Sequence, residues 1–220
     1  MCLLAIERSS AIGSAAIFKD GVCLLETSVE LRPGGIGPDA CAMVTQVLDE
    51  SGAGVETLSS FAVGLGPGSF SGIRSALAFV TGMALPDGLP IIGIGSAMAV
   101  AWGVMQTTGA ASVSVVGDAR RGSLWLTTCQ RSGTSLKVTE ELRLVPRDQL
   151  AAELPEASLV ATPDWPRLGD WLKGQLAAER LLAQAALPRA RAIGELALEQ
   201  SVPRVEPPLP LYLHPAVATH

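Results

Sequence analysis

The sequence predicts an α/β protein of two lobes, in which the second lobe is a reduced copy of the first. Residues 1–107 read as three strands, a helix and then two strand–helix pairs. From about residue 109 the pattern starts again, with a strand that ends in a carboxylate as the first strand does. We therefore expect a first lobe over 1–107, a reduced second lobe over 108–200 and an extended tail over 201–220.

Composition narrows the function classes. The 220 residues are 48% hydrophobic with a mean hydropathy of +0.37, and no apolar run reaches the ~20 residues of a membrane span. The first residues lack a basic start, so we expect a cytoplasmic protein without a signal peptide. The net charge of −5 disfavours direct binding of nucleic acid. His214 and His220 are the only histidines and both lie at the end, which disfavours Ser–His, Cys–His and zinc chemistry.

The first 52 residues predict three strands joined by short turns, followed by a helix. Asp20-Gly21 is a hairpin turn, and the glycines and prolines of residues 32–38 predict a loop. Asp39 is placed to cap a helix that runs to Ser51, with Gly52 as its end. The expected strands are Cys2–Glu7, Gly13–Phe18 and Val22–Leu31.

A glycine-rich turn follows the next strand, Phe61–Leu65, and leads into a helix that reaches about Leu85. Its residues are Gly66, Pro67, Gly68, Ser69, Phe70, Ser71, Gly72, Ile73 and Arg74. Ser69 or Ser71 can cap the helix, and free backbone N–H groups there would suit an anion or a partner's acceptor groups. The alternative is a turn that only connects two elements. The turn lacks the lysine of a phosphate-binding P-loop, and Phe70 stands where a hydrolase elbow has serine.

These two helices carry more apolar surface than one packing contact requires. On the first helix Ala40, Met43 and Val47 form one apolar row, and Cys41, Val44 and Leu48 form another. One alternative is that both rows pack within the chain; the other is that one row is kept for a partner protein. On the second alternative the candidate partner-interface residues are Ala40, Met43, Val47, Gly72, Ala76, Phe79 and Met83.

The rest of the chain completes the first lobe and forms the second. A strand at Pro90–Gly95 and a helix at Ala97–Gln106, capped by Ser96, close the first lobe. The second lobe is expected to contain the strands Ser112–Asp118, Ser123–Gln130, Leu136–Leu144 and Leu159–Ala161, a short helix at Asp148–Glu153 and helical segments at Arg167–Ala186 and Arg189–Gln200. Tyr212, the only tyrosine, is expected to anchor the tail.

Carboxylates end the leading strands of both halves. Glu7 and Asp118 could hold a hydrated Mg²⁺ between the lobes, with Arg120 nearby, so these three residues are a candidate vestigial cleft. A nucleotide in this cleft is disfavoured by Arg8, which occupies a position where a small residue with a hydroxyl group would help to bind a phosphate. The alternative is that Glu7 and Asp118 only end their strands, facing solvent, and form ion pairs with Arg8 or Arg120.

The order of strands and helices in residues 1–107 is that of the ribonuclease-H-like lobes of the actin, Hsp70 and sugar-kinase superfamily. In addition, the nine residues from Gly66 to Arg74 closely resemble the Gly-Pro-Gly-Ser-Phe-Thr-Gly-x-Arg signature of the bacterial TsaB family, also called YeaZ-like or glycoprotease-like; only Ser71 differs. The segments 118–122 and 209–213 also resemble segments of that family.

The resemblance implies an accessory subunit with no catalytic residue or metal of its own. It would take part in making N6-threonylcarbamoyladenosine at position 37 of tRNA, paired through its first two helices with a TsaD-like catalytic subunit and joined by a TsaE-like ATPase. It would meet tRNA only through that complex. A homodimer is the alternative in isolation. No tightly bound cofactor is implied, although a nucleotide can lie at the partner interface.

The chain departs from the family pattern at three places, and the first two departures weaken a nucleotide or metal role for it. Glu7-Arg8 replaces Asp-Thr, residues 34–38 replace a His-centred motif, and His214 replaces an arginine. Two competing hypotheses remain: an ATP-dependent phosphotransferase or ATPase of the same superfamily, and a peptidase of the kind suggested by the glycoprotease name.

Overall fold

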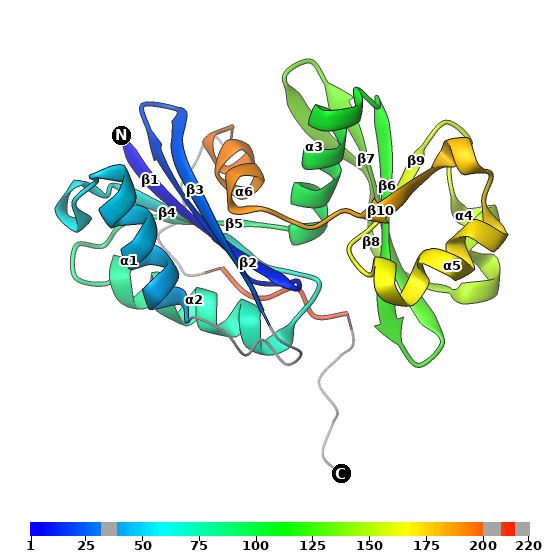
Figure 1. Ribbon diagram of the computed structural model, residues 1–220, viewed down its shortest axis with the longest axis horizontal. Coiled ribbons are helices and arrows are strands. Elements are labelled where there is room, and N and C mark those ends of the chain that lie inside the picture. Colours follow the sequence, from blue (N-terminus) through cyan, green and yellow to red (C-terminus); the bar gives the residue numbers. More distant parts are fainter. Residues whose placement is uncertain (32–38, 200–207, 214–220) are drawn as a thin grey trace, which may run out of the picture.

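The computed structural model describes all residues except 32–38, 200–207 and 214–220. Two five-stranded sheets lie beside each other, with helices on their faces (Figure 1). The first sheet contains β1 (Cys2–Glu7), β2 (Ile12–Lys19), β3 (Val22–Glu30), β4 (Ser60–Gly64) and β5 (Ile91–Ile94). The second contains β6 (Ser112–Arg120), β7 (Ser123–Ser132), β8 (Ser135–Pro146), β9 (Leu159–Thr162) and β10 (Leu181–Ala185).

The two sheets share one topology. The first has the order β3-β2-β1-β4-β5 and the second the order β8-β7-β6-β9-β10. In each, the first three strands are antiparallel neighbours and the last two add in parallel. The predicted α/β fold of two ribonuclease-H-like lobes is therefore confirmed.

The helices are α1 (Ala40–Ser51), α2 (Phe70–Ala84), α3 (Ser96–Thr108), α4 (Leu150–Glu153), α5 (Trp165–Gln175) and α6 (Ala190–Leu198), with short 3₁₀ turns η1 (Val55–Thr57), η2 (Arg147–Gln149) and η3 (Ala178–Arg180). Asp39 caps α1, as predicted, because its carboxylate accepts from the Ala42 N–H at 2.8 Å. Gly52 ends α1 in the left-handed conformation, with φ 68°.

The second sheet is more complete than the sequence predicts. We expected a helix over Arg167–Ala186, but α5 ends at Gln175 and β10 follows. Residues 181–185 are Leu, Ala and Gln, which favour helices, but pairing with β9 overrides this preference. The reduction of the second lobe lies in its helices, since α4 has only four residues.

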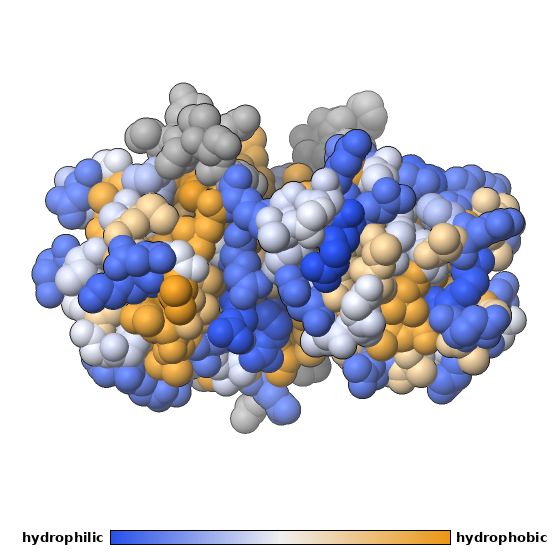
Figure 2. All heavy atoms as spheres, turned by 90° about the horizontal axis from the view of Figure 1, so that it is seen from above, coloured by the Kyte–Doolittle hydropathy of each residue, from blue (hydrophilic) through white to orange (hydrophobic). Residues whose placement is uncertain are grey.

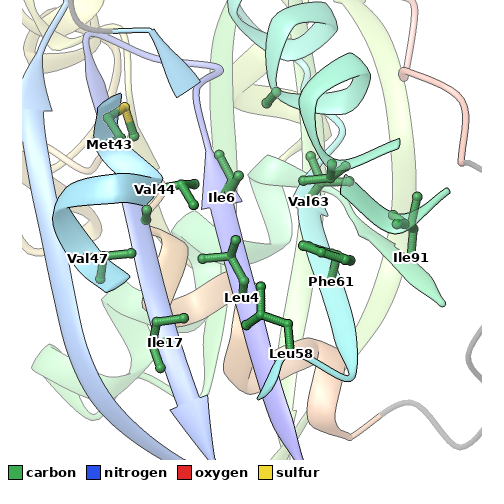
Figure 3. Close-up of a cluster of buried hydrophobic side chains, with 14 of the residues drawn as sticks. Leu4, Ile6, Ile17, Met43, Val44, Val47, Leu58, Phe61, Val63 and Ile91 are labelled. Atoms are coloured by element: carbon green, nitrogen blue, oxygen red, sulfur yellow. The ribbon is translucent and has the colours of Figure 1, made fainter. Parts of the chain in front are cut away.

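Alternating residues of β1 face two separate cores. Leu4 and Ile6 point to α1 and α2, whereas Leu3 and Ala5 point to α6. Figure 3 shows Met43 and Val47 of α1 directed at the sheet in the first of these cores.

The lobes exchange one helix each. Helix α3 follows β5 of the first sheet but packs on the second sheet, and α6 follows β10 of the second sheet but packs on the first. The two helices also touch, and the Trp102 indole N–H donates to Glu195 at 2.8 Å. Residues 96–108 and 190–198 thus each pack on the sheet opposite to the one that they follow in the chain.

The start of α6 is fixed by polar groups of the first sheet. The Ser14 hydroxyl on β2 accepts from the Ala190 N–H at 2.8 Å, and both groups are buried. Glu26 on β3 accepts from the Arg191 N–H at 3.0 Å and from the Arg189 guanidinium at 3.2 Å.

Replacing Ser14 with alanine is expected to lower the free energy of unfolding by about 1–3 kcal/mol, because it leaves the buried Ala190 N–H without its acceptor. Urea denaturation measures the loss. The control is Ser28→Ala on β3, whose side chain is exposed and should change little. Equal effects of the two substitutions would contradict this role of Ser14.

Seen from above, a hydrophilic band runs over the join between the two halves, and hydrophobic residues gather to either side of it (Figure 2). Within the residues that the structure describes, none of the helices is both long and apolar enough to cross a membrane.

Candidate functional site

The glycine-rich turn between β4 and α2 packs directly on the end of β1. A Cβ on Gly68 would overlap the Ser9 carbonyl oxygen, and one on Gly72 would overlap the Arg8 carbonyl oxygen. Gly66 has φ +92°, a conformation that side chains disfavour, and the Gly66–Pro67 peptide bond is cis. Gly68 and Gly72 are therefore required by contact with residues 8 and 9, and Gly66 is required by its backbone conformation.

Backbone N–H groups of the turn donate within the chain. The Ser69 N–H donates to the Ser9 carbonyl at 2.7 Å, and the Gly66 N–H donates to the Ser96 hydroxyl at 2.9 Å. Ser69 caps α2, because its hydroxyl accepts from the Gly72 N–H at 3.3 Å and its carbonyl accepts from the Ile73 N–H at 2.9 Å. The N–H groups of Gly66, Ser69 and Gly72 are therefore occupied within the chain, which reduces the number of donors that the turn could offer a phosphate.

Glu7 lies beneath this turn and is fully buried. One carboxylate oxygen accepts from the Ser9 N–H and the other from the Ser96 hydroxyl at 2.7 Å. Burial raises the pKa of Glu7, and the hydrogen bonds from Ser9 and Ser96 oppose that rise. Ser96 is the first residue of α3 and does not cap it, contrary to our expectation, because its side chain links Glu7 to Gly66.

A cleft of about 940 Å³ lies between the lobes, and the three predicted cleft residues lie differently around it. Asp118 and Arg120 line the cleft, but Glu7 does not. The neighbouring Arg8 is buried and its guanidinium donates to the Met43 sulfur on α1 at 3.0 Å. The structure therefore does not bring Glu7 and Asp118 together as a pair of metal ligands.

Asp118 belongs instead to a group of two carboxylates and two arginines. Its side chain lies 3.6 Å from the Arg120 guanidinium and 3.4 Å from that of Arg167. Arg167 also pairs with Asp164 at 2.6 Å, and Asp164 accepts from the Asp118 N–H at 2.9 Å. The charges of this group sum to zero, so it offers neither excess positive charge for phosphates nor free carboxylates for a metal. Among the described residues, no group of three or more His, Cys, Asp or Glu side chains could hold a metal ion.

The residues proposed for a partner interface mostly lie inside the chain. Ala40, Met43, Val47, Gly72 and Ala76 are buried, so their side chains cannot form an outer surface. Phe79 and Met83 are partly buried against the same core. The first alternative, in which the apolar rows pack within the chain, therefore holds for these residues.

The outer faces of α1 and α2 carry other residues. On α2 the exposed positions Ser71, Ser75, Ala78 and Gly82 follow helical spacing, and Arg74 is the only charged residue of the helix. The exposed residues of α1 include Cys41, Ala42, Thr45 and Gln46. The small side chains of α2 leave room for another chain to approach the helix closely, whereas Asp49 and Glu50 add two exposed carboxylates at the end of α1.

The signature also contacts the end of the chain. The Arg74 guanidinium donates to the Tyr212 hydroxyl from two nitrogens, at 3.1 and 2.9 Å, and lies 3.8 Å from the centre of the Phe70 ring. Tyr212 thus anchors the tail, as predicted.

Sequence reasoning missed Asp164 and Arg167. Both follow β9, which occupies in the second sheet the place that β4 has in the first. Aligning the two halves strand by strand would have pointed to the Pro163–Pro166 loop as the equivalent of the glycine-rich turn.

Comparisons with known proteins agree with this architecture. The family model TsaD, described as tRNA N6-adenosine threonylcarbamoyltransferase, matches residues 39–161, more than half of the chain. The chain is 31% identical to the tRNA threonylcarbamoyladenosine biosynthesis protein TsaB of Escherichia coli over 70% of this chain and 65% of the relative. It is 32% identical to the protein of the same name from Haemophilus influenzae, over 57% of this chain and 52% of that relative. The matches thus span about half to two thirds of the length of these relatives.

A solved structure extends the likeness to nearly the whole fold. A protein from Pseudomonas aeruginosa, described as similar to the peptidase YeaZ, superposes with a TM-score of 0.81 at 24% identity, over 97% of this chain and 99% of that one. This structure shows the shared fold, and the family model and the two curated relatives agree on one assignment. The chain belongs to the family that the TsaD model describes and, within it, to the TsaB, or YeaZ, group.

Proposed function

We propose that this chain is an accessory subunit in the synthesis of N6-threonylcarbamoyladenosine on tRNA. It pairs with a TsaD-like catalytic subunit, is joined by a TsaE-like ATPase and contributes no catalytic residue. The pathway is inferred from family membership, because the curated relatives and the family model are named after this tRNA modification. The assignment of an accessory role rests on the site.

Two features of the site favour pairing over catalysis. Three N–H groups of the turn that would hold a phosphate, those of Gly66, Ser69 and Gly72, donate within the chain, and Glu7 is buried beneath the turn. In contrast, the outer face of α2 is exposed, small and nearly free of charge. An ATPase or phosphotransferase would need a glycine-rich turn that is open to a phosphate. A subunit that pairs with another chain needs an exposed outer face on α2.

The proposed contact is the outer face of α1 and α2, in place of the buried rows that the sequence suggested. Ser75, Ala78 and Gly82 would let a partner helix approach closely, and a Cβ built on Gly82 meets no atom within 4 Å. The same face would pair two copies of this chain in isolation.

Reconstitution tests the proposal. Adding this chain to the TsaD-like and TsaE-like proteins of the same genome, with ATP, threonine, bicarbonate, tRNA and the enzyme that forms the threonylcarbamoyl donor, is expected to raise the yield of modified adenosine at least tenfold. Gly82→Arg should abolish that increase, because a long charged side chain then stands on the contact face.

The matched control is Gly174→Arg, which places the same side chain on an exposed site of α5 where a Cβ also meets nothing within 4 Å. It should activate as well as the parent chain. A parent chain that fails to raise the yield would refute the accessory role, and a Gly82→Arg chain that remains fully active would refute the assigned face.

A further inference from the structure

The segment 208–213, here called the strap, runs along the first lobe at the mouth of the cleft. The Leu211 N–H donates to the Leu65 carbonyl at the end of β4, at 2.9 Å. Pro208 packs so closely on β5 that a Cβ on Gly93 would lie 2.7 Å from it. The strap is therefore docked on the edge of the sheet and is not a loose end.

A clamp at the start of α2 holds the outer part of the strap. It consists of Phe70, Arg74 and Tyr212, with Arg74 donating twice to the Tyr212 hydroxyl and the two rings 5.9 Å apart. Phe70 and Tyr212 are each 54% exposed. Since the clamp lies at the surface and involves one neutral hydroxyl, it can open without disturbing the core.

The end of the strap reaches the other lobe. Leu213 packs against the core that α3 forms with the second sheet. Pro210, Leu211, Tyr212 and Leu213 line the cleft on one side, and Asp118 and Arg167 of the second lobe line it on the other. The strap thus touches both lobes across the cleft.

The covalent joints between the lobes lie elsewhere. They are the exchanged helices α3 and α6, linked by the hydrogen bond between Trp102 and Glu195. Figure 1 places these helices at the top of the join and the strap (red) at the bottom. A pair of joints on one side and a docked segment on the other is the arrangement of a hinge and a latch.

We propose that the strap is a latch that holds the two lobes closed over the cleft, and that the Arg74–Tyr212 clamp sets how often the lobes open. Removing the clamp hydrogen bonds should weaken docking of the strap and populate a more open arrangement. This inference concerns the motion of the chain and does not depend on the proposed function.

Distance measurement between spin labels tests the latch. Cys41 on the outer face of α1 is exposed and takes one label; Lys137→Cys on β8 takes the other, with Cys23→Ser to remove the half-buried thiol. The chain with an intact clamp is expected to give a single narrow distance distribution. Tyr212→Phe keeps the ring but removes the hydroxyl, so a second, separate distance should appear, and Arg74→Gln should enlarge that population.

Hydrogen exchange gives the second reading. Loss of the clamp hydrogen bonds should speed exchange of the Leu211 amide about fivefold. Lys173→Gln, which removes an exposed cation on α5, is the control and should change neither reading. The latch is refuted if Leu211 exchanges faster while the distance distribution stays unchanged, because the strap would then be only a docked tail. It is also refuted if neither reading changes in Tyr212→Phe and Arg74→Gln.

Discussion

Replacing Gly72 with alanine is expected to lower the free energy of unfolding by about 3 kcal/mol. Helix preference alone predicts the opposite sign, because alanine is favoured over glycine within a helix by about 1 kcal/mol. The contact with β1 decides between the two effects. A Cβ at position 72 overlaps the Arg8 carbonyl oxygen, a backbone atom that cannot move aside as a flexible side chain would.

Gly103→Ala on α3 is the matched control. It lies within a helix and a Cβ there meets nothing within 4 Å, so alanine should stabilise the chain by about 0.5–1 kcal/mol. Urea or thermal unfolding of the two variants measures the difference. If both substitutions stabilise the chain, then α2 does not pack on residue 8 as described.

Replacing Glu7 with glutamine is expected to lower the free energy of unfolding by about 2 kcal/mol near pH 5, with the deficit shrinking as the pH rises. In the neutral acid that burial favours, Glu7 presents one carbonyl oxygen and one O–H group to Ser9 and Ser96, whereas an amide places two N–H donors in the same buried position. The additional amide N–H, buried without an acceptor, accounts for the loss.

The pH dependence follows from the direction of the pKa shift. Because burial raises the pKa of Glu7 in the folded chain above its ordinary value of 4.5, the stability that Glu7 gains is full below about pH 4.5 and is lost as the pH rises through the folded pKa. In that window the gap between the parent chain and Glu7→Gln should narrow by at most about 1.4 kcal/mol per pH unit.

Denaturation at a series of pH values measures this gap, and Glu50→Gln, at an exposed position on α1, serves as the control. The control removes a carboxylate at the surface and should cost little stability, so it isolates the effect of removing the buried one. A Glu7→Gln gap that is constant, or that widens with pH, would contradict the burial of an ionisable group at this position.

The order of strands and helices could be predicted from the sequence because it depends on local patterns. Buried strands such as β1 and β4 are short apolar runs, and Asp39 and Gly52 mark the ends of α1 by their own chemistry. β10 could not be predicted in this way, because its residues favour a helix and only pairing with β9 makes them a strand.

The candidate site shows a similar limit. The sequence indicates that glycines 66, 68 and 72 are needed, but not that Gly68 and Gly72 face residues 8 and 9, some 60 positions earlier. Met43 and Val47 were candidates for a partner face because they are apolar. Apolar side chains are equally typical of a hydrophobic core, and both residues lie in the core. The exposed face is marked instead by Ser75, Ala78 and Gly82, whose small size gives no signal until the packing is known.

The central claim is that this chain meets its partner through the outer face of α1 and α2. Hydrogen exchange of the chain, alone and in complex with the TsaD-like subunit of the same genome, tests it most directly. We predict that protection in the complex is concentrated in residues 40–51 and 70–85, with the edge strand β8 unchanged. Protection of β8 or of the Asp118–Arg167 side of the cleft, with α1 and α2 exchanging as in the free chain, would contradict the claim.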